Sequence, residues 1–140
     1  MRIKIVSRNG RLPQYETSGS SGMDLRSVEA VVIGPGERAL VATGIFIELP
    51  QGYEGQVRAR SGLAVKHGIG LVNGIGTIDS DYRGEIKIPL INWGTEPYKI
   101  EKDDRIAQLI ISKYERINWE LVEELGQTKR NEKGFGSSGK

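Results

Sequence analysis

The chain has 140 residues, of which 37% are hydrophobic, with 20 Lys and Arg against 18 Asp and Glu and no cysteine. This length corresponds to one domain with a modest core, and the lack of cysteine excludes disulfides and cysteine-based zinc sites. The first residues alternate between charged and apolar side chains and no apolar run approaches about 20 residues, so neither a secretion signal nor a membrane helix is expected. A cytoplasmic protein without membrane partners is the default.

The net charge of +2 is unevenly distributed along the chain. Residues 126–140 have a net charge of +3, which leaves −1 for residues 1–125. The tail contains one acidic and four basic residues: Glu132, Lys129, Arg130, Lys133 and Lys140. Proteins that bind long nucleic acids usually spread basic residues over a face. This pattern favours a small polyanion and no nucleic acid, unless the tail is simply a solvated end.

Nineteen glycines separate short apolar runs. Seven runs with alternating or continuous apolar residues are predicted to be strands: Ile3–Val6, Ala30–Ile33, Ala39–Val41, Ile45–Leu49, Tyr53–Ala59, Glu85–Asn92 and Ile106–Ser112. The only helical candidates are Ser61–Lys66 and Trp119–Leu125, both short. Pro89 interrupts a predicted strand, which argues for an edge position or a bulge. The pattern predicts an all-β sandwich or barrel over residues 1–125, followed by a flexible arm over residues 126–140.

The segment Gly76–Glu85 places two carboxylates, a phenol ring and a guanidinium between glycines. An aspartate in a partly desolvated turn can act as a general base on water, and the flat ring of Tyr82 can form the wall of a pocket. Alternatively, Asp79 and Asp81 only form the turn and Arg83 pairs with one of them.

Three other segments contain groups suited to a phosphate ligand. Arg60-Ser61-Gly62 offers a guanidinium, a hydroxyl and helix-start N–H groups, although Ser61 could be an ordinary N-cap. Asp24 is either a buried hydrogen-bonded acid or a ligand of hydrated Mg²⁺. Gln108 either contacts a ligand or makes a cross-strand hydrogen bond. His67, the only histidine, is interpreted as structural because no second His or Cys could share a zinc ion.

The last residues, Gly134–Gly139, set Phe135 and two serines among glycines. Such a segment can wrap closely around a ligand, with the serines donating to phosphate and the ring stacking on a base. Ordering it costs about 1–2 kcal/mol per residue of backbone. We therefore expect it to close as a lid only over a highly charged ligand.

Taken in order, five segments resemble the motifs of the trimeric dUTPases over residues 21–139. They are Ser-Gly-Met-Asp-Leu, Arg-Ser-Gly-Leu-Ala, Gly-Thr-Ile-Asp-Ser-Asp-Tyr-Arg-Gly-Glu, Arg-Ile-Ala-Gln-Leu and Arg-x-x-x-Gly-Phe-Gly-Ser-Ser-Gly. The third and fifth are highly specific. The resemblance implies a jelly-roll-like β subunit with one short helix, a homotrimer with active sites between subunits, and Mg²⁺-dependent hydrolysis of dUTP to dUMP and pyrophosphate.

The resemblance also implies a role for each matching residue. Asp79 would activate or orient the attacking water, Tyr82 would pack against the deoxyribose and exclude a 2′-hydroxyl, and Asp24 would hold Mg²⁺ through water. Asn73 and the backbone of the hairpin 72–81, which includes Gly76, would bind the uracil edge within a stiff pocket. The phosphates would be contacted from other subunits by Arg60, Ser61, Gly62 and Gln108. The closing arm would contribute Arg130, Phe135, Gly136, Ser137 and Ser138.

Four positions depart from the family pattern without removing a catalytic group. Met23 stands where an aromatic residue is usual, Asn131 and Lys133 replace glycines of the arm, and Ser138 replaces a threonine. A dCTP deaminase of the same fold is the nearest alternative, but it would need a glutamate beside the pyrimidine, and residues 68–78 contain no acid. A non-catalytic nucleotide-binding trimer would not need Asp79, Tyr82 and the arm.

Overall fold

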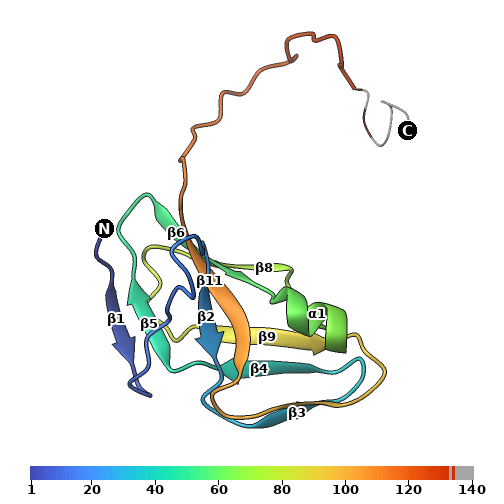
Figure 1. The fold of residues 1–140 in the computed structure, drawn as a ribbon. Helices are drawn as coiled ribbons and strands as arrows, with labels where there is room; N and C mark the ends of the chain where they lie inside the picture. Colours follow the sequence, from blue (N-terminus) through green and yellow to red (C-terminus); the bar gives the residue numbers. More distant parts are fainter. Residues whose placement is uncertain (133, 135–140) are drawn as a thin grey trace.

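The computed structural model describes residues 1–132 and 134 of the chain. In this part the chain forms eleven antiparallel β-strands and one short helix in a jelly-roll-like arrangement, which confirms the all-β prediction (Figure 1). The helix, α1, spans Ser61–His67. Among the described residues, no helix has the length and apolar character needed to cross a bilayer.

Two larger sheets and two strand pairs make up the fold. The four-stranded sheet is ordered β2 (Met23–Arg26), β11 (Arg105–Lys113), β6 (Tyr53–Arg58) and β8 (Ile75–Ile78). The three-stranded sheet is ordered β4 (Arg38–Ala42), β9 (Lys87–Asn92) and β7 (Ile69–Leu71). The pairs are β1 (Lys4–Ser7) with β5 (Ile45–Glu48), and β3 (Val31–Ile33) with β10 (Tyr98–Ile100).

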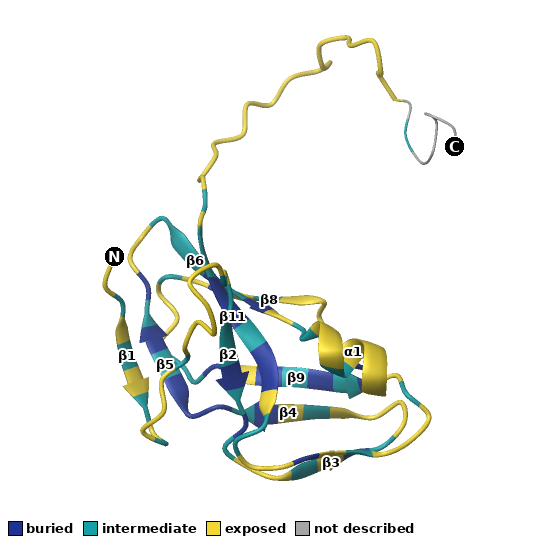
Figure 2. Cartoon of the chain, in the orientation of Figure 1, coloured by how far each residue is buried: buried dark blue, intermediate teal, exposed yellow. Residues whose placement is uncertain are grey.

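The core lies between the sheets and is built from alternate residues of the strands. In β9, for example, Ile88, Leu90 and Asn92 are buried while the residues between them are not. Successive side chains of a strand point to opposite faces, so one face of each sheet collects the apolar residues. The buried aliphatic side chains include Leu25, Ile33, Val41, Ile69, Ile88, Leu90, Ile100, Ile106 and Leu109. In Figure 2 the strands hold the buried residues, and the chain after β11 is almost entirely exposed.

All seven predicted strands overlap observed ones, but four strands were missed: β2, β7, β8 and β10. These have three or four residues each, and β7 and β8 each contain a glycine, so neither length nor alternation marks them. The segment treated as a hairpin does not pair with itself. Instead β7 pairs with β9 and β8 pairs with β6, so the two strands belong to different sheets.

Two further predictions were wrong. Residues 119–125 form no helix, because seven residues with no packed face cannot offset the cost of helix nucleation. Pro89 is not on an edge strand, since β9 runs between β4 and β7. Its missing N–H is tolerated because β7 ends at the residue opposite Leu90, and beyond that point the carbonyl of Pro89 accepts the N–H of Val72 at 2.9 Å. In an antiparallel strand the N–H and C=O of one residue face the same side.

The buried amide of Asn92 connects three parts of the chain around the end of β9. Its Nδ2 donates to the carbonyls of Ile33 and Glu96, each at 2.8 Å, and its Oδ1 accepts the N–H of Gly94 at 2.8 Å. Gly94 in turn packs against Gly68, the C-cap of α1, whose φ is +68°. The side chain of Asn92 therefore holds the helix end against the three-stranded sheet.

Replacing Asn92 by Ala should lower the free energy of unfolding by about 2–4 kcal/mol, because the buried groups that it satisfies lose their partner. Chemical denaturation at one fixed protein concentration measures this change. Asn118→Ala is the matched control, since Asn118 is exposed and its removal should alter stability by less than about 0.5 kcal/mol. Equal effects of the two substitutions would contradict the role given to Asn92.

Candidate functional site

A cavity of about 250 Å³ brings together four of the predicted site residues: Asn73, Gly76, Asp79 and Tyr82. Strand β8 and the turn after it form one wall, and Leu40, Lys87 and Pro89 of β4 and β9 form another. Leu40 and Lys87 were not expected in the site. Nothing in the sequence marks them, because only the pairing of β4 with β9 brings Leu40 opposite Pro89.

The backbone that lines this cavity is held on both sides of Asn73. The N–H of Gly74 donates to the carbonyl of Leu71 at 3.2 Å, and the N–H of Ile75 donates to the carbonyl of Asn73 at 2.8 Å. Along β8, Gly76 pairs with the buried Val57 of β6, and an added Cβ on this glycine would lie 3.2 Å from the Cβ of Val57. A wall of paired backbone yields little, so the cavity has a fixed shape.

The turn that follows β8 positions Asp79 and Tyr82. The N–H of Tyr82 donates to the carbonyl of Asp79 at 3.1 Å, and the Tyr82 hydroxyl donates to the carbonyl of Glu85 at 3.0 Å. Arg83 Nη1 donates to the carbonyls of Ser80 and Tyr82, at 2.7 and 2.9 Å. In the described part of the chain no ion pair joins Arg83 to Asp79 or Asp81, so the pairing considered as an alternative does not form.

Asp79 is exposed and lies between two spaces. One is the cavity beside Asn73, and the other is an open, polar hollow of about 650 Å³ that also involves Arg83 and Arg116. A carboxylate in this position can reach a water molecule from either space. The geometry therefore suits a base that acts at the mouth of the cavity.

A second group of predicted residues surrounds the carboxylate of Asp24. Oδ1 of Asp24 lies 3.0 Å from Nε of Arg60, and Oδ2 lies 3.3 Å from Nη1 of Arg105. Arg105 also pairs with Glu16 at 3.3 Å. We call Asp24, Arg60, Arg105 and Gln108 the arginine cluster. Arg105 was not predicted as a site residue, and its place there follows from the pairing of β11 with β2.

Gln108 and the start of α1 complete this region. Nε2 of Gln108 donates to the carbonyl of Ala59 at 3.0 Å, which is the cross-strand hydrogen bond considered as an alternative. A Cβ added to Gly22 would lie 2.5 Å from the Oε1 of Gln108, so a larger residue at position 22 would displace the end of the Gln108 side chain. The N-cap of α1 is Arg60, so Ser61 is not an N-cap, and both Ser61 and Gly62 are exposed.

The cavity and the arginine cluster lie far apart within one chain. Across the four-stranded sheet, Asp24 pairs with Gln108, Gln108 with Arg58, and Arg58 with Ile75. Asp79 comes four residues after Ile75, toward the other end of the sheet. Three strand spacings of about 4.8 Å and a rise of about 3.3 Å per residue place the Cα atoms of Asp24 and Asp79 roughly 20 Å apart.

The remaining predicted residues lie in the tail. Arg130 is exposed on the chain that leaves the body after β11 (Figure 1). Beside it, Thr128 and Asn131 form a turn in which each side chain accepts the backbone N–H of the other, at 2.9 and 2.7 Å. Phe135, Gly136, Ser137 and Ser138 lie outside the described residues.

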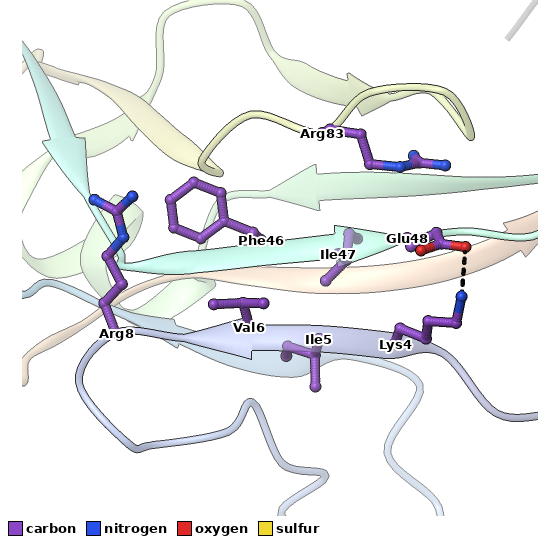
Figure 3. A pocket seen from close by; sticks show the side chains of 8 residues that line it. All are labelled: Lys4, Ile5, Val6, Arg8, Phe46, Ile47, Glu48 and Arg83. Carbon is purple, nitrogen blue, oxygen red and sulfur yellow. Dashed lines mark hydrogen bonds and ion pairs between the residues drawn. The ribbon is translucent and has the colours of Figure 1, made fainter.

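A third hollow, of about 360 Å³, is lined by none of the predicted site residues. It is formed by β1, β5 and Arg83, and Val6 and Phe46 are among the side chains that line it (Figure 3). The guanidinium of Arg8 stacks on the ring of Phe46, with its Cζ 4.6 Å from the ring centroid. At the other end the Lys4 ammonium bonds Glu48 at 3.0 Å and lowers the pKa of that exposed carboxyl. The ring of His67 packs against the ring of Tyr98, with the two ring centroids 4.7 Å apart.

A family model described as dUTPase matches residues 8–139, nearly the whole chain. The chain belongs to the dUTPase family. This confirms the resemblance found in the five ordered motifs.

Individual members of the dUTPase family support the assignment. A deoxyuridine 5′-triphosphate nucleotidohydrolase of Finegoldia magna is 54% identical over 142 residues, covering 99% of each chain. A mutant dUTPase of Staphylococcus bacteriophage 80alpha, solved with dUpNHpp, has a TM-score of 0.90 and 30% identity, covering 99% of this chain and 98% of that one. A mutant dUTPase of phage phi11 of S. aureus has a TM-score of 0.81 and 26% identity, covering 89% and 98%. The phi11 structure describes the coordination of a structural Mg(II) ion.

The metal-ligating side chains of this dUTPase-family chain fit Mg²⁺ only as an ion that is also bound by water and by substrate phosphates. Among residues 1–132 and 134, no group of three or more His, Cys, Asp or Glu side chains could hold a metal ion. Both oxygens of Asp24 already face guanidinium groups. Mg²⁺ keeps several waters and commonly takes one or two carboxylates together with substrate phosphates. The arginine cluster therefore fits an ion that arrives on a triphosphate, with Asp24 as the single carboxylate.

Proposed function

We propose that the chain hydrolyses dUTP to dUMP and pyrophosphate. The observation that supports this most strongly is the 250 Å³ cavity, which gathers Asn73, Gly76, Asp79 and Tyr82 from one short segment. These are the residues to which the family motif assigns the base, the sugar and the attacking water. The name of the Finegoldia relative describes the same activity, at 54% identity over the full chain.

In this proposal the cavity binds deoxyuridine. The amide of Asn73 and the backbone around Gly76 bond the uracil edge, whose donor and acceptor pattern is reversed in cytosine. In a yielding pocket the 5-methyl group of thymine changes the binding free energy by only about 1–3 kcal/mol, so the rejection of thymine needs a stiff wall. The pairing of β8 with β6 supplies such a wall. Lys87, which also lines the cavity, adds a positive charge at its rim.

Asp79 acts on the attacking water. The water attacks the α-phosphorus and Asp79 accepts its proton. The bond from the α-phosphorus to the oxygen that bridges to the β-phosphate breaks, and pyrophosphate leaves with the bonding electrons. The developing negative charge requires fixed positive groups nearby.

The arginine cluster of a neighbouring subunit supplies these groups. Arg60, with the hydroxyl of Ser61 and the N–H of Gly62, binds phosphate oxygens, and Gln108 bonds the phosphates or their bound water. Mg²⁺ held through water by Asp24 would neutralise the triphosphate and polarise its phosphoryl oxygens. When the triphosphate enters, its oxygens compete with the carboxylate of Asp24 for the two guanidinium groups.

The separation within one chain supports a homotrimer with shared sites. A nucleotide with its base beside Asn73 and its α-phosphate beside Asp79 points its triphosphate away from Arg60 of the same chain, because Ile75, not Asp79, is level with Asp24 in the sheet. Ile117, Trp119 and Leu121 alternate along the chain and are exposed. Apolar side chains in such a row are typical of a surface that another subunit covers. The hollow in Figure 3 offers the apolar side chains of Val6 and Phe46 for such a contact.

We also propose that residues 126–140 form the closing arm. Arg130, Ser137 and Ser138 would contact the phosphates. Phe135 would stack on uracil, and such stacking contributes about 1–3 kcal/mol to the binding free energy. The described residues after β11 lead away from the body of the subunit, which supports an arm that reaches the site of a neighbouring subunit (Figure 1).

A nucleotide panel tests the proposed activity. With dUTP, dCTP, dTTP and UTP in the presence of Mg²⁺, we expect pyrophosphate from dUTP alone. Asp79→Asn should reduce turnover by about 10²–10⁴-fold, the usual contribution of a general base, while dUTP still binds. Ammonia from dCTP would indicate a deaminase, and no reaction with any nucleotide would indicate a binding protein. Normal turnover by the Asp79→Asn variant would show that Asp79 is not the base.

Deletion of residues 130–140 tests the arm. The truncated protein should remain folded and trimeric, because the core and the exposed apolar segment are intact, and its turnover of dUTP should fall strongly. Circular dichroism and light scattering report fold and mass, and pyrophosphate release reports activity. Loss of the folded state would show instead that the arm has a structural role, and unchanged turnover would show that it has none in catalysis.

A further inference from the structure

The side chain of Tyr82 lies flat on the backbone that follows it. A Cβ built on Gly84 would overlap the hydroxyl oxygen and Cζ of Tyr82 and would lie 2.9 Å from its Cε2. The ring therefore occupies the space that any other residue at position 84 would fill. The φ of Gly84 lies outside the left-handed region, so the backbone itself would accept an alanine. The glycine is needed here for space and not for conformation.

The same backbone binds the end of the ring. The hydroxyl of Tyr82 donates to the carbonyl of Glu85 at 3.0 Å. Tyr82 is half-exposed, and the ring face that points away from Gly84 lines the cavity. Residues on the cavity side therefore do not fix the ring. An exposed tyrosine samples several rotamers. Within residues 1–132 and 134, the fit on Gly84 and the bond to Glu85 are the contacts that keep the ring in one position.

The backbone under the ring is itself anchored to the turn between β4 and β5. Oε1 of Glu85 accepts the N–H of Gly44 at 2.8 Å, and the N–H of Ile86 donates to the carbonyl of Ile45 at 2.8 Å. The buried hydroxyl of Thr43 donates to the carbonyl of Ile86 at 2.6 Å. A ring that rests on this backbone is supported by the core. It can resist a ligand atom that presses on it.

We propose that Gly84 is a specificity-determining position that makes the Tyr82 ring a rigid wall against the 2′-hydroxyl of a ribonucleotide. This inference rests on the proposed function, in which Tyr82 faces the sugar of dUTP. A wall can exclude one oxygen atom only if it cannot move aside, because a yielding pocket discriminates poorly against an added hydroxyl. Gly84 acts through Tyr82 and is a positioning residue, not a catalytic one.

The test compares kcat/KM for dUTP and for UTP in matched variants. In Gly84→Ala the new methyl group displaces the ring, and the preference for dUTP over UTP should fall by roughly tenfold or more. Gly19→Ala is the control, because Gly19 has open space around it and no positive φ, and its preference should stay unchanged. Tyr82→Phe keeps the ring and removes only the hydroxyl bond, so a smaller fall is expected, and it serves if Gly84→Ala does not fold.

A double-mutant cycle shows whether the effect passes through the ring. In a Tyr82→Ala background, Gly84→Ala should change the dUTP/UTP ratio no further, since no ring remains to be displaced. An unchanged ratio in Gly84→Ala or, if that variant is unfolded, in Tyr82→Phe would overturn the inference. An equal fall with and without the ring would do so too. A wild-type protein that does not hydrolyse dUTP would instead overturn the proposed function.

Discussion

The pairing register of the four-stranded sheet is the constraint on which the rest of the site depends. It sets Asp24, Gln108, Arg58 and Ile75 in one row and leaves Asp79 at the other end. The register is fixed by the core, because Leu25, Val57 and Leu109 are buried on the same face, and a slip of one residue would turn all three outward. The distance between Asp79, the proposed base, and the arginine cluster is therefore built into the fold.

This separation divides the chemistry into two halves with different physical demands. In the proposed mechanism the cavity that binds uridine must be stiff, because it has to distinguish small differences in ring and sugar. It is lined by paired backbone and by the Tyr82 ring, which packs on Gly84. The phosphate half must adapt to a large charge. Its two arginines both contact the carboxylate of Asp24, and Arg105 also contacts Glu16, which keeps the guanidinium groups oriented and offsets their positive charge. In the proposed trimer the two halves meet across a subunit boundary, so each half can satisfy its own demand.

Much of this could be predicted from the sequence, and the failures have physical causes. Strands with clear alternation, such as the one that contains Ile88 and Leu90, were found, whereas β7, with three residues and a central glycine, is defined only by its partner β9. Asp79 and Tyr82 carry reactive or flat side chains within one short motif, so the sequence marked them as site residues, and both line the cavity. Leu40 and Arg105 were not, because strand pairing alone brings them to the site. The helix expected over residues 119–125 does not form, because the segment has no surface in the chain to pack against.

The claim that neighbouring chains complete each site is tested most directly by mixing two inactive variants. Asp79→Asn removes the base and Arg60→Ala removes the phosphate contact, and each should be inactive alone. After the two are unfolded together and refolded at equal concentrations, about a quarter of the sites should combine an intact Asp79 with an intact Arg60 from the neighbouring chain. Recovery of about a quarter of wild-type turnover is the predicted result. If the refolded mixture is as inactive as its components although light scattering shows mixed oligomers, each site lies within one chain and the account is contradicted.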